Sequence, residues 1–171
     1  MVNEEMATRI SKNFTLEEFT ASSTAKANGI TNVPSTQQVA NLCALVHNVL
    51  QPLRDAMGHE IKIGSGYRCP RLNAAVGGVS NSQHMNGEAA DFYVGWNGPK
   101  EKAPSRRELL IKAFRQIITD EHINFDQCII YPSFIHVSYV HSGRKNRRKL
   151  TRGFSNGTYA ALSHAQAMAL E

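Results

Sequence analysis

Residues 64–93 constrain this chain more than any other stretch, because they hold two candidate metal ligands, His84 and Asp91, in a His-x6-Asp spacing. A histidine nitrogen and a carboxylate oxygen are both common ligands of Zn²⁺. A third candidate, His136, lies inside an apolar, strand-like segment at residues 134–140. Two histidines and one aspartate leave a coordination position open for water, which is typical of catalytic zinc sites. Without His136, a hydrogen-bonded polar pair in a loop would be the simpler interpretation.

These residues also resemble the motifs of a known family. Ser82-x-His84-x-x-Gly87-x-Ala89-x-Asp91, followed by His136-Val137-Ser138, is similar to the zinc D-Ala-D-Ala carboxypeptidases and phage endolysin peptidases. The upstream segment Ser65-Gly66-Tyr67-Arg68-x-Pro70 resembles the arginine motif of the same family. The resemblance covers roughly residues 12–142, and it is specific because three motifs occur in the right order.

The resemblance implies one zinc ion per chain, with the ligands His84, Asp91 and His136. It also implies that Arg68 contacts the substrate or the transition state, because a guanidinium can fork onto a carboxylate or stabilise an oxyanion. The alternative is a structural arginine paired with a nearby carboxylate. Ser82 and Ser138, which belong to the same motifs, are predicted to contact the substrate.

The chain departs from the family at the position of the catalytic base. In the resembling family a Glu or Asp stands three residues before the last zinc-binding histidine, and here that position is Ser133. Asp126 is the nearest upstream carboxylate and is our candidate base. A tight hairpin that pairs Ile129 with His136 would point Asp126 to the opposite face, unless a bulge reverses it. Glu88 is another candidate, at a position that the family does not use.

Hydrophobic periodicity predicts an α+β fold. Helical spacing runs from Ser35 to Gly58, and again through residues 105–118. Strand-like segments lie at residues 61–63 and 89–94, and residues 125–140 read as a β-hairpin. We therefore expect a small antiparallel sheet with helices packed on one side, carrying a single zinc site.

We expect two regions. Residues 1–142 should form the peptidase-like domain, with its core at about residues 12–142, and residues 143–171 should form a basic C-terminal tail. The net charge of the chain is +5. Such a tail is either a solvated, partly disordered segment or a means of electrostatic attachment to an anionic cell-wall polymer. Residues 158–170 could form a short helix.

Other features bound the location and the partners. There is no apolar run of about 18 residues, so no membrane span is expected. The chain begins Met-Val-Asn-Glu-Glu, without the apolar region of a signal peptide. We therefore expect synthesis in the cytoplasm and action on the cell wall after release during phage lysis. The cysteines Cys43, Cys69 and Cys128 give no disulfide framework.

The sequence thus favours a zinc metallopeptidase that cleaves peptidoglycan stem peptides, an endolysin-like, cell-wall-degrading hydrolase acting as a monomer. The alternative is a zinc-containing wall-binding or virion module that has lost turnover, an interpretation that Ser133 favours. A nucleic-acid-binding protein is a third hypothesis. Its support is the basic tail alone, because the core has no helix-turn-helix or zinc-finger pattern.

Overall fold

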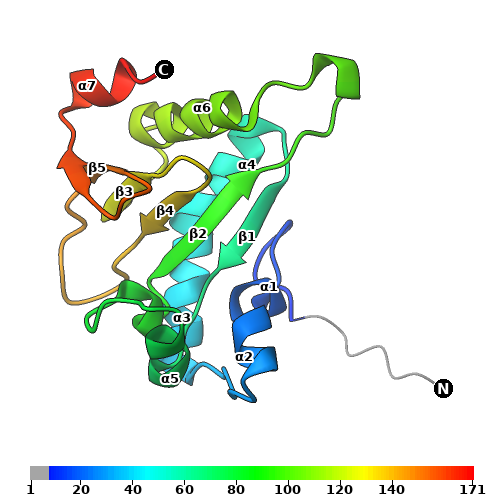
Figure 1. Ribbon diagram of the computed structural model, residues 1–171, viewed down its shortest axis with the longest axis vertical. Coiled ribbons are helices and arrows are strands. Elements are labelled where there is room, and N and C mark those ends of the chain that lie inside the picture. Colours follow the sequence, from blue (N-terminus) through cyan, green and yellow to red (C-terminus); the bar gives the residue numbers. More distant parts are fainter. Residues whose placement is uncertain (1–7) are drawn as a thin grey trace.

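A mixed β-sheet organises the structure, a computed structural model that describes residues 8–171 (Figure 1). Within these residues the sheet has six strands in the order β1-β2-β4-β3-β5-β6. Their bounds are Ile61–Ser65 (β1), Ala89–Val94 (β2), Gln127–Ile130 (β3), Ile135–Ser138 (β4), Lys149–Gly153 (β5) and Tyr159–Ala161 (β6). The helices are α1 (Leu16–Thr20), α2 (Ser23–Ala27), α3 (Thr36–Leu45), α4 (Gln51–Met57), α5 (Pro70–Ala75), α6 (Arg106–Thr119) and α7 (His164–Met168), with 3₁₀ turns η2 (Gln83–Asn86) and η3 (Lys100–Lys102).

The expectation of a purely antiparallel sheet is wrong at one strand pair. Neighbouring strands run antiparallel except β3 and β5, which are parallel. β4 ends beside the start of β3, where Ser138 faces Gln127. The loop at residues 139–148 then crosses that end of β3, so β5 enters at Lys149 in the same direction as β3. The α+β class and the predicted hairpin of β3 and β4 are confirmed.

The helical segment predicted from Ser35 to Gly58 is present, but its middle is π-helical at η1 (Val46–Leu50). Pro52 accounts for this, because proline has no N–H and its ring clashes with the carbonyl four residues earlier. That carbonyl belongs to Asn48, and it accepts a hydrogen bond from the backbone N–H of Asn124 at 3.2 Å. The irregular turn therefore ties the long helix to the segment that leads into β3.

The two faces of the sheet differ in character. Alternate strand residues on one face pack against α3, α4 and α6 and form the core: Ala90, Phe92, Val94, Cys128, Ile130, Ile135 and Val137. Figure 1 shows α3 and α4 running behind the strands. The opposite face carries a row of paired positions that crosses the sheet: Ser65, Asp91, His136, Ile129 and Thr151. Two candidate ligands thus lie side by side on the face away from the core helices.

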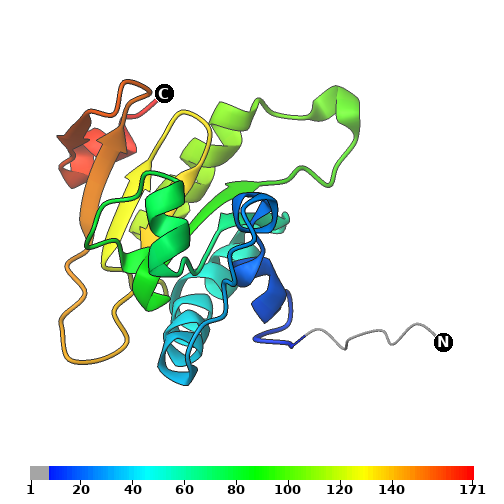
Figure 2. The same cartoon turned by 60° about the horizontal axis from the view of Figure 1, so that its bottom comes forward.

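The region after residue 142 is part of this fold, which corrects the expectation of a separate basic tail. Figure 2 shows the orange strands continuing the sheet beyond the yellow β3. Leu150, Ala167 and Leu170 are buried in the main core. Most of the basic side chains at residues 144–148 make internal contacts, as described below. The region is ordered because it supplies apolar side chains to the core and cations to buried carboxylates.

Within residues 8–171 none of the helices has both the length and the apolar character needed to cross a bilayer. The expectation about an N-terminal leader concerns residues 1–7 and lies outside the described residues.

We predict that deletion of residues 143–171 unfolds the protein. The deletion exposes the edge of β3, removes Leu150 from the core and leaves two buried carboxylates without their arginines. Domains of this size are stable by only about 5–15 kcal/mol. Far-UV circular dichroism with a thermal melt would measure the loss. A shorter deletion of residues 163–171, which removes α7 alone, should lower the melting temperature and keep a cooperative transition. A wild-type melt for the long deletion would contradict this account.

Candidate metal centre

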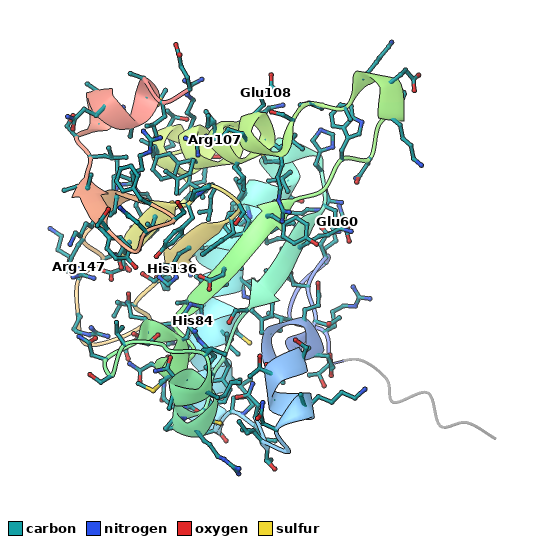
Figure 3. The ribbon with its side chains drawn as sticks, in the orientation of Figure 1. Glu60, His84, Arg107, Glu108, His136 and Arg147 are labelled. Carbon is teal, nitrogen blue, oxygen red and sulfur yellow. The ribbon has the colours of Figure 1, made fainter. Side chains whose placement is uncertain are left out.

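Three potential ligands converge on the open face of the sheet. His84 Nε2 lies 3.2 Å from Asp91 Oδ1 and 3.2 Å from His136 Nδ1, and His136 Nδ1 lies 2.8 Å from Asp91 Oδ1. His84 comes from η2, Asp91 from β2 and His136 from β4, and Figure 3 shows the two histidines side by side. The structure therefore brings together all three residues that the sequence singled out as metal ligands.

These distances suit a tetrahedral zinc ion. Ligand atoms at about 2.0–2.1 Å from a tetrahedral zinc lie roughly 3.3 Å from one another. The ring of His84 is also oriented for binding, because its Nδ1 donates a hydrogen bond to the carbonyl of Gly66 at 2.7 Å. That bond places the proton on Nδ1 and leaves the Nε2 lone pair free for a metal. The donor set and its geometry thus fit Zn²⁺.

Gly66 can hold this carbonyl in place because it has no side chain. A Cβ at this position would lie 2.5 Å from the carbonyl oxygen of Phe19. The neighbouring N–H of Tyr67 donates to that same oxygen at 2.7 Å. The arginine motif and α1 therefore pack backbone against backbone, and this contact fixes the carbonyl that orients His84.

Helix α3 holds the η2 turn from the other side. The amide side chain of Gln38 donates to the carbonyl of Met85 at 3.0 Å, and that of Asn41 donates to the carbonyl of Asn86 at 2.9 Å. Gly87 follows with φ +70°, and a Cβ there would lie 2.5 Å from the carbonyl oxygen of Gln38. The small residue of the motif thus permits close approach of the ligand turn to α3.

Electrostatics keep Asp91 ionised and His84 neutral. Burial alone would raise the pKa of the Asp91 carboxyl, but the adjacent imidazoles of His136 and His84 hold it well below its usual range. Burial lowers the pKa of His84, partly offset by its hydrogen bond to Asp91. A carboxylate and a neutral imidazole are the states that bind metal ions.

Arg68 lies beside this centre. Its backbone N–H donates to the carbonyl of His84 at 3.1 Å, and its side chain lines a cavity of about 210 Å³ together with Asp91 and Ser22. Burial lowers the pKa of its guanidinium, and the charge of Asp91 opposes that shift. Its Nε is buried without a hydrogen-bond partner among the described residues. The arginine therefore lines a cavity that also borders Asp91.

Asp126 does not reach the centre, which corrects its assignment as the candidate base. The predicted register is confirmed, with Ile129 opposite His136. The Asp126 side chain is buried and accepts hydrogen bonds from Arg147 at 2.6 and 2.8 Å and from Gln83 at 3.1 Å. Burial raises the pKa of its carboxyl, but the contacts with Arg147 and Gln83 together bring that pKa below its usual value. A carboxylate held in this way is a structural group.

Glu88 is likewise committed to an internal contact. It is buried and forms an ion pair with Arg144 at 2.9 Å. Strand alternation places it on the face opposite Asp91, since the two residues are separated by an odd number of positions. It is therefore unsuited to act as the base.

Ser82 and Ser138 are buried and engaged with backbone. The hydroxyl of Ser82 caps η2 by accepting the N–H of His84 at 3.4 Å, and that of Ser138 accepts the N–H of Gln127 at 3.1 Å. Ser138 has 0% exposure and Ser82 has 8%. Their position corrects the expectation of substrate contacts, because both hydroxyls support the strand and turn that carry the ligands.

A second cavity, of about 260 Å³, borders Asp91 on the other side. Its lining includes Ser133, Phe134, Tyr93 and Arg106. Arg106 lies over the ring of Tyr93, 4.3 Å from its centroid. Of the described residues that line the two cavities, Asp91 alone carries a carboxylate. Ser133 thus lines the same cavity as Asp91, and it carries a hydroxyl rather than a carboxylate.

The sequence analysis did not identify Tyr93, Phe134 or Arg106 as site residues. Tyr93 stands two positions after Asp91 on β2, and Phe134 stands two positions before His136, directly ahead of β4, so the period-two spacing could have placed both on the ligand face. Arg106 begins α6, far from the motifs, and its sequence context gives no corresponding signal.

The fold and the site define a class, a metallopeptidase-like sheet with a two-histidine, one-aspartate centre beside an arginine. Residues 12–138 match the family Peptidase M15, and the chain belongs to that family. A stretch of 50 residues is 48% identical to the zinc D-Ala-D-Ala carboxypeptidase of Streptomyces albus G and covers 29% of this chain. It spans 20% of the length of that relative. The family resemblance seen in the sequence is confirmed.

We predict about one zinc ion per wild-type chain and its loss in His84→Ala and His136→Ala. Each substitution removes one of three protein ligands, and the two that remain bind zinc weakly. Metal content after dialysis would be measured by atomic emission. His122→Ala, at an exposed histidine that contacts Asp120, is the matched control and should keep the metal. Wild-type zinc content in either ligand variant would contradict the site.

A second prediction concerns Gly87. Alanine there must adopt a left-handed backbone and also collide with Gln38, so Gly87→Ala should cost about 2–5 kcal/mol in the free energy of unfolding. Gly77→Ala is the matched control, because Gly77 has the same φ of +70° with nothing within 4 Å of its added Cβ. It should cost about 1–2 kcal/mol. Urea unfolding measures both, and zinc affinity should fall for Gly87→Ala alone. Equal effects would mean that the contact with α3 does not position His84.

Proposed function

We propose that this protein is a zinc-dependent peptidase that cleaves peptidoglycan stem peptides. The observation that carries the proposal is the set of ligands His84, Asp91 and His136, which converge beside Arg68 on an open sheet face in a chain of the Peptidase M15 family. The name of the Streptomyces relative, a zinc D-Ala-D-Ala carboxypeptidase, supports the choice of metal and of substrate class. An endolysin-like role at the cell wall, after release during phage lysis, is part of this proposal.

In this proposal three residues bind the metal and a fourth binds the substrate. His84, Asp91 and His136 would hold zinc, which when bound lowers the pKa of a water ligand to about 7 and polarises a carbonyl. Arg68, which lines one of the two cavities, would bind a substrate carboxylate or the oxyanion formed at the scissile carbonyl.

The two cavities suggest how a peptide would lie. They share Gly64, Ser65 and Asp91, and they extend from there toward Arg68 in one direction and toward Arg106 in the other. A peptide that crosses Asp91 could therefore place its scissile bond at the metal and groups on either side of it in separate cavities.

The test is digestion of purified peptidoglycan, with the released fragments identified by mass spectrometry. The wild-type protein should release peptide fragments in a zinc-dependent manner, and Arg68→Gln should reduce kcat/KM by about 10²–10³ if it stabilises the oxyanion. Arg54→Gln is a control on α4, in a pocket lined by Asn13 and Glu60 and by none of the candidate ligands. No release by the wild type would overturn the peptidase proposal.

A second candidate function is a zinc-containing wall-binding or virion module without turnover. The observation that favours it is Ser133, which stands where the family has a carboxylate, beside a centre whose cavities offer no free carboxylate among the described residues. Asp126 and Glu88 cannot substitute, because arginines engage both.

Ser133→Glu separates the two functions. Ser133 is exposed at a short turn, where the N–H of Tyr131 donates to the carbonyl of Phe134 at 2.9 Å, so a longer side chain has room. We expect a gain in hydrolysis of about 10²–10⁴ if the groove is intact and only the base is missing. Ser155→Glu, at an exposed position elsewhere on the surface, controls for added charge. Retained zinc without any gain would favour the binding module.

A further inference from the structure

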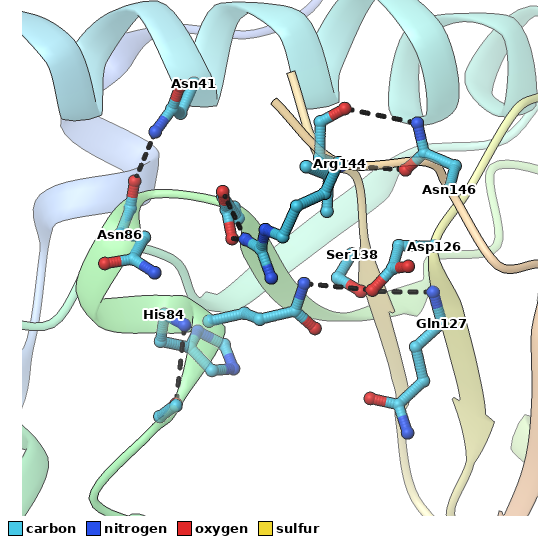
Figure 4. Close-up of polar contacts among 12 residues, drawn as sticks. Asn41, His84, Asn86, Asp126, Gln127, Ser138, Arg144 and Asn146 are labelled. Carbon is cyan, nitrogen blue, oxygen red and sulfur yellow. Dashed lines mark hydrogen bonds and ion pairs between the residues drawn. The ribbon is translucent and has the colours of Figure 1, made fainter. Parts of the chain in front are cut away.

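The ligand His84 lies in a short segment, residues 83–88, that is closed on itself. The N–H of Glu88 donates to the carbonyl of Gln83 at 3.0 Å, so the first and last residues of the segment are adjacent. Glu88 contacts Arg144 directly, and Gln83 reaches Arg147 through the carboxylate of Asp126. Figure 4 shows Arg144 and Asp126 near His84.

The first contact runs through Asp126. Arg147 forks onto this carboxylate, with Nη2 to Oδ2 at 2.6 Å and Nε to Oδ1 at 2.8 Å, and its backbone N–H adds a third bond at 3.1 Å. Asp126 Oδ2 also accepts a hydrogen bond from the side-chain amide of Gln83 at 3.1 Å. Gln83 precedes His84 directly, so Asp126 links the loop to the start of the ligand segment.

The second contact is direct. Arg144 Nη2 lies 3.0 and 2.9 Å from the two carboxylate oxygens of Glu88. The Glu88 side chain is 9% exposed, whereas that of Arg144 is 60% exposed. The carbonyl of Glu88 also accepts the N–H of Tyr139, directly after β4. The end of the ligand segment is therefore held by both the loop and the strand that carries His136.

The loop itself has a defined shape. The side chain of Asn146 bonds both the N–H and the carbonyl of Val140, at 2.8 and 3.1 Å. Arg148 has a left-handed backbone with φ 53°, and its guanidinium lies 4.6 Å from the centroid of the Phe125 ring. It donates to the carbonyls of Ile123 and Ile118. None of these contacts involves residues 83–88. The loop is therefore held in shape independently of its contacts with the ligand segment.

We propose that Arg147 and Arg144 are positioning residues for the metal centre, which hold the His84 segment from its two ends in the geometry that binds the ion. This proposal rests on the metal centre of the proposed function. A positioning role differs from a purely structural role in its consequence. Loss of these arginine contacts must lower the metal affinity by more than the accompanying loss of folding stability explains. Groups that orient metal ligands from outside the coordination sphere typically change affinity by 10–100-fold.

The most selective test is Gln83→Ala. It leaves the buried Asp126–Arg147 pair intact and removes the link between that pair and the ligand segment. We expect zinc affinity to fall by about tenfold, at the low end of the range for such groups. Arg147→Ala should weaken binding by about 10–100-fold, and Arg147→Lys should restore part of it. Zinc dissociation constants would be measured on the metal-free full-length proteins by competition with a chromogenic chelator, at a temperature where every variant is folded.

The control is Arg148→Ala in the same loop. It removes contacts to Phe125, Ile123 and Ile118 and should lower the melting temperature while zinc affinity stays within about twofold of wild type. The visible absorption spectrum of the Co²⁺-loaded proteins provides a second readout. Gln83→Ala and Arg147→Ala should shift the d–d bands, whereas Arg148→Ala should not, because these bands report ligand geometry.

Three results would overturn the proposal. One is wild-type zinc affinity and an unchanged Co²⁺ spectrum in Gln83→Ala and in whichever arginine variants fold. Another is an equal loss of affinity in Arg148→Ala, which would make the effect one of general stability. The third is a wild-type protein that binds no zinc, which would remove the metal centre itself. A wild-type protein that binds zinc but releases no peptide would overturn the proposed peptidase function and leave this inference standing, since none of its readouts depends on turnover.

Discussion

The pairing of Asp91 with His136 across β2 and β4 is the constraint on which the site depends. Because side chains alternate along a strand, this register sends both ligands to one face and sends Ala90 and Val137 to the core. A slip of one residue would bury the ligands under the helices and expose the apolar residues. The packing of the core against α3, α4 and α6 therefore also specifies the metal site, with His84 added from the turn that precedes β2.

Buried carboxylates explain why the C-terminal region is needed. Glu88 and Asp126 lie close to the ligands with almost no exposed surface, and a buried charge is costly unless it is paired. Among the described residues, no basic side chain of the strands forms an ion pair with either carboxylate. Arg144 and Arg147 supply one each from the loop that carries the chain across the end of β3. The parallel strand β5 thus follows from the same crossover that neutralises the carboxylates.

The sequence predicted the candidate metal ligands better than it predicted the strand and the loop that surround them. The grouping of the three candidate ligands and the pairing of Ile129 with His136 were predictable, because motif spacing and a tight turn depend on local chemistry. The parallel placement of β5 and the roles of Arg144 and Arg147 were not. A cluster of basic residues has the same appearance in a sequence whether it is solvated or paired, and the partners of these two arginines lie far away along the chain. The predicted substrate contacts of Ser82 and Ser138 were wrong for a related reason. A motif does not show whether a serine hydroxyl bonds to the backbone or faces the substrate.

The fold does not constrain the residue at position 133, and this separates metal binding from catalysis. Ser133 lies in an exposed turn whose closing hydrogen bond, from Tyr131 to Phe134, uses backbone atoms alone. A carboxylate could be gained or lost there without altering the core, the sheet register or the ligands. His84, Asp91 and His136 are instead held by buried contacts that other elements depend on. The set of candidate ligands is therefore compatible with both proposed functions, a peptidase and a binding module, and these two proposals differ in the role they give to the turn position 133.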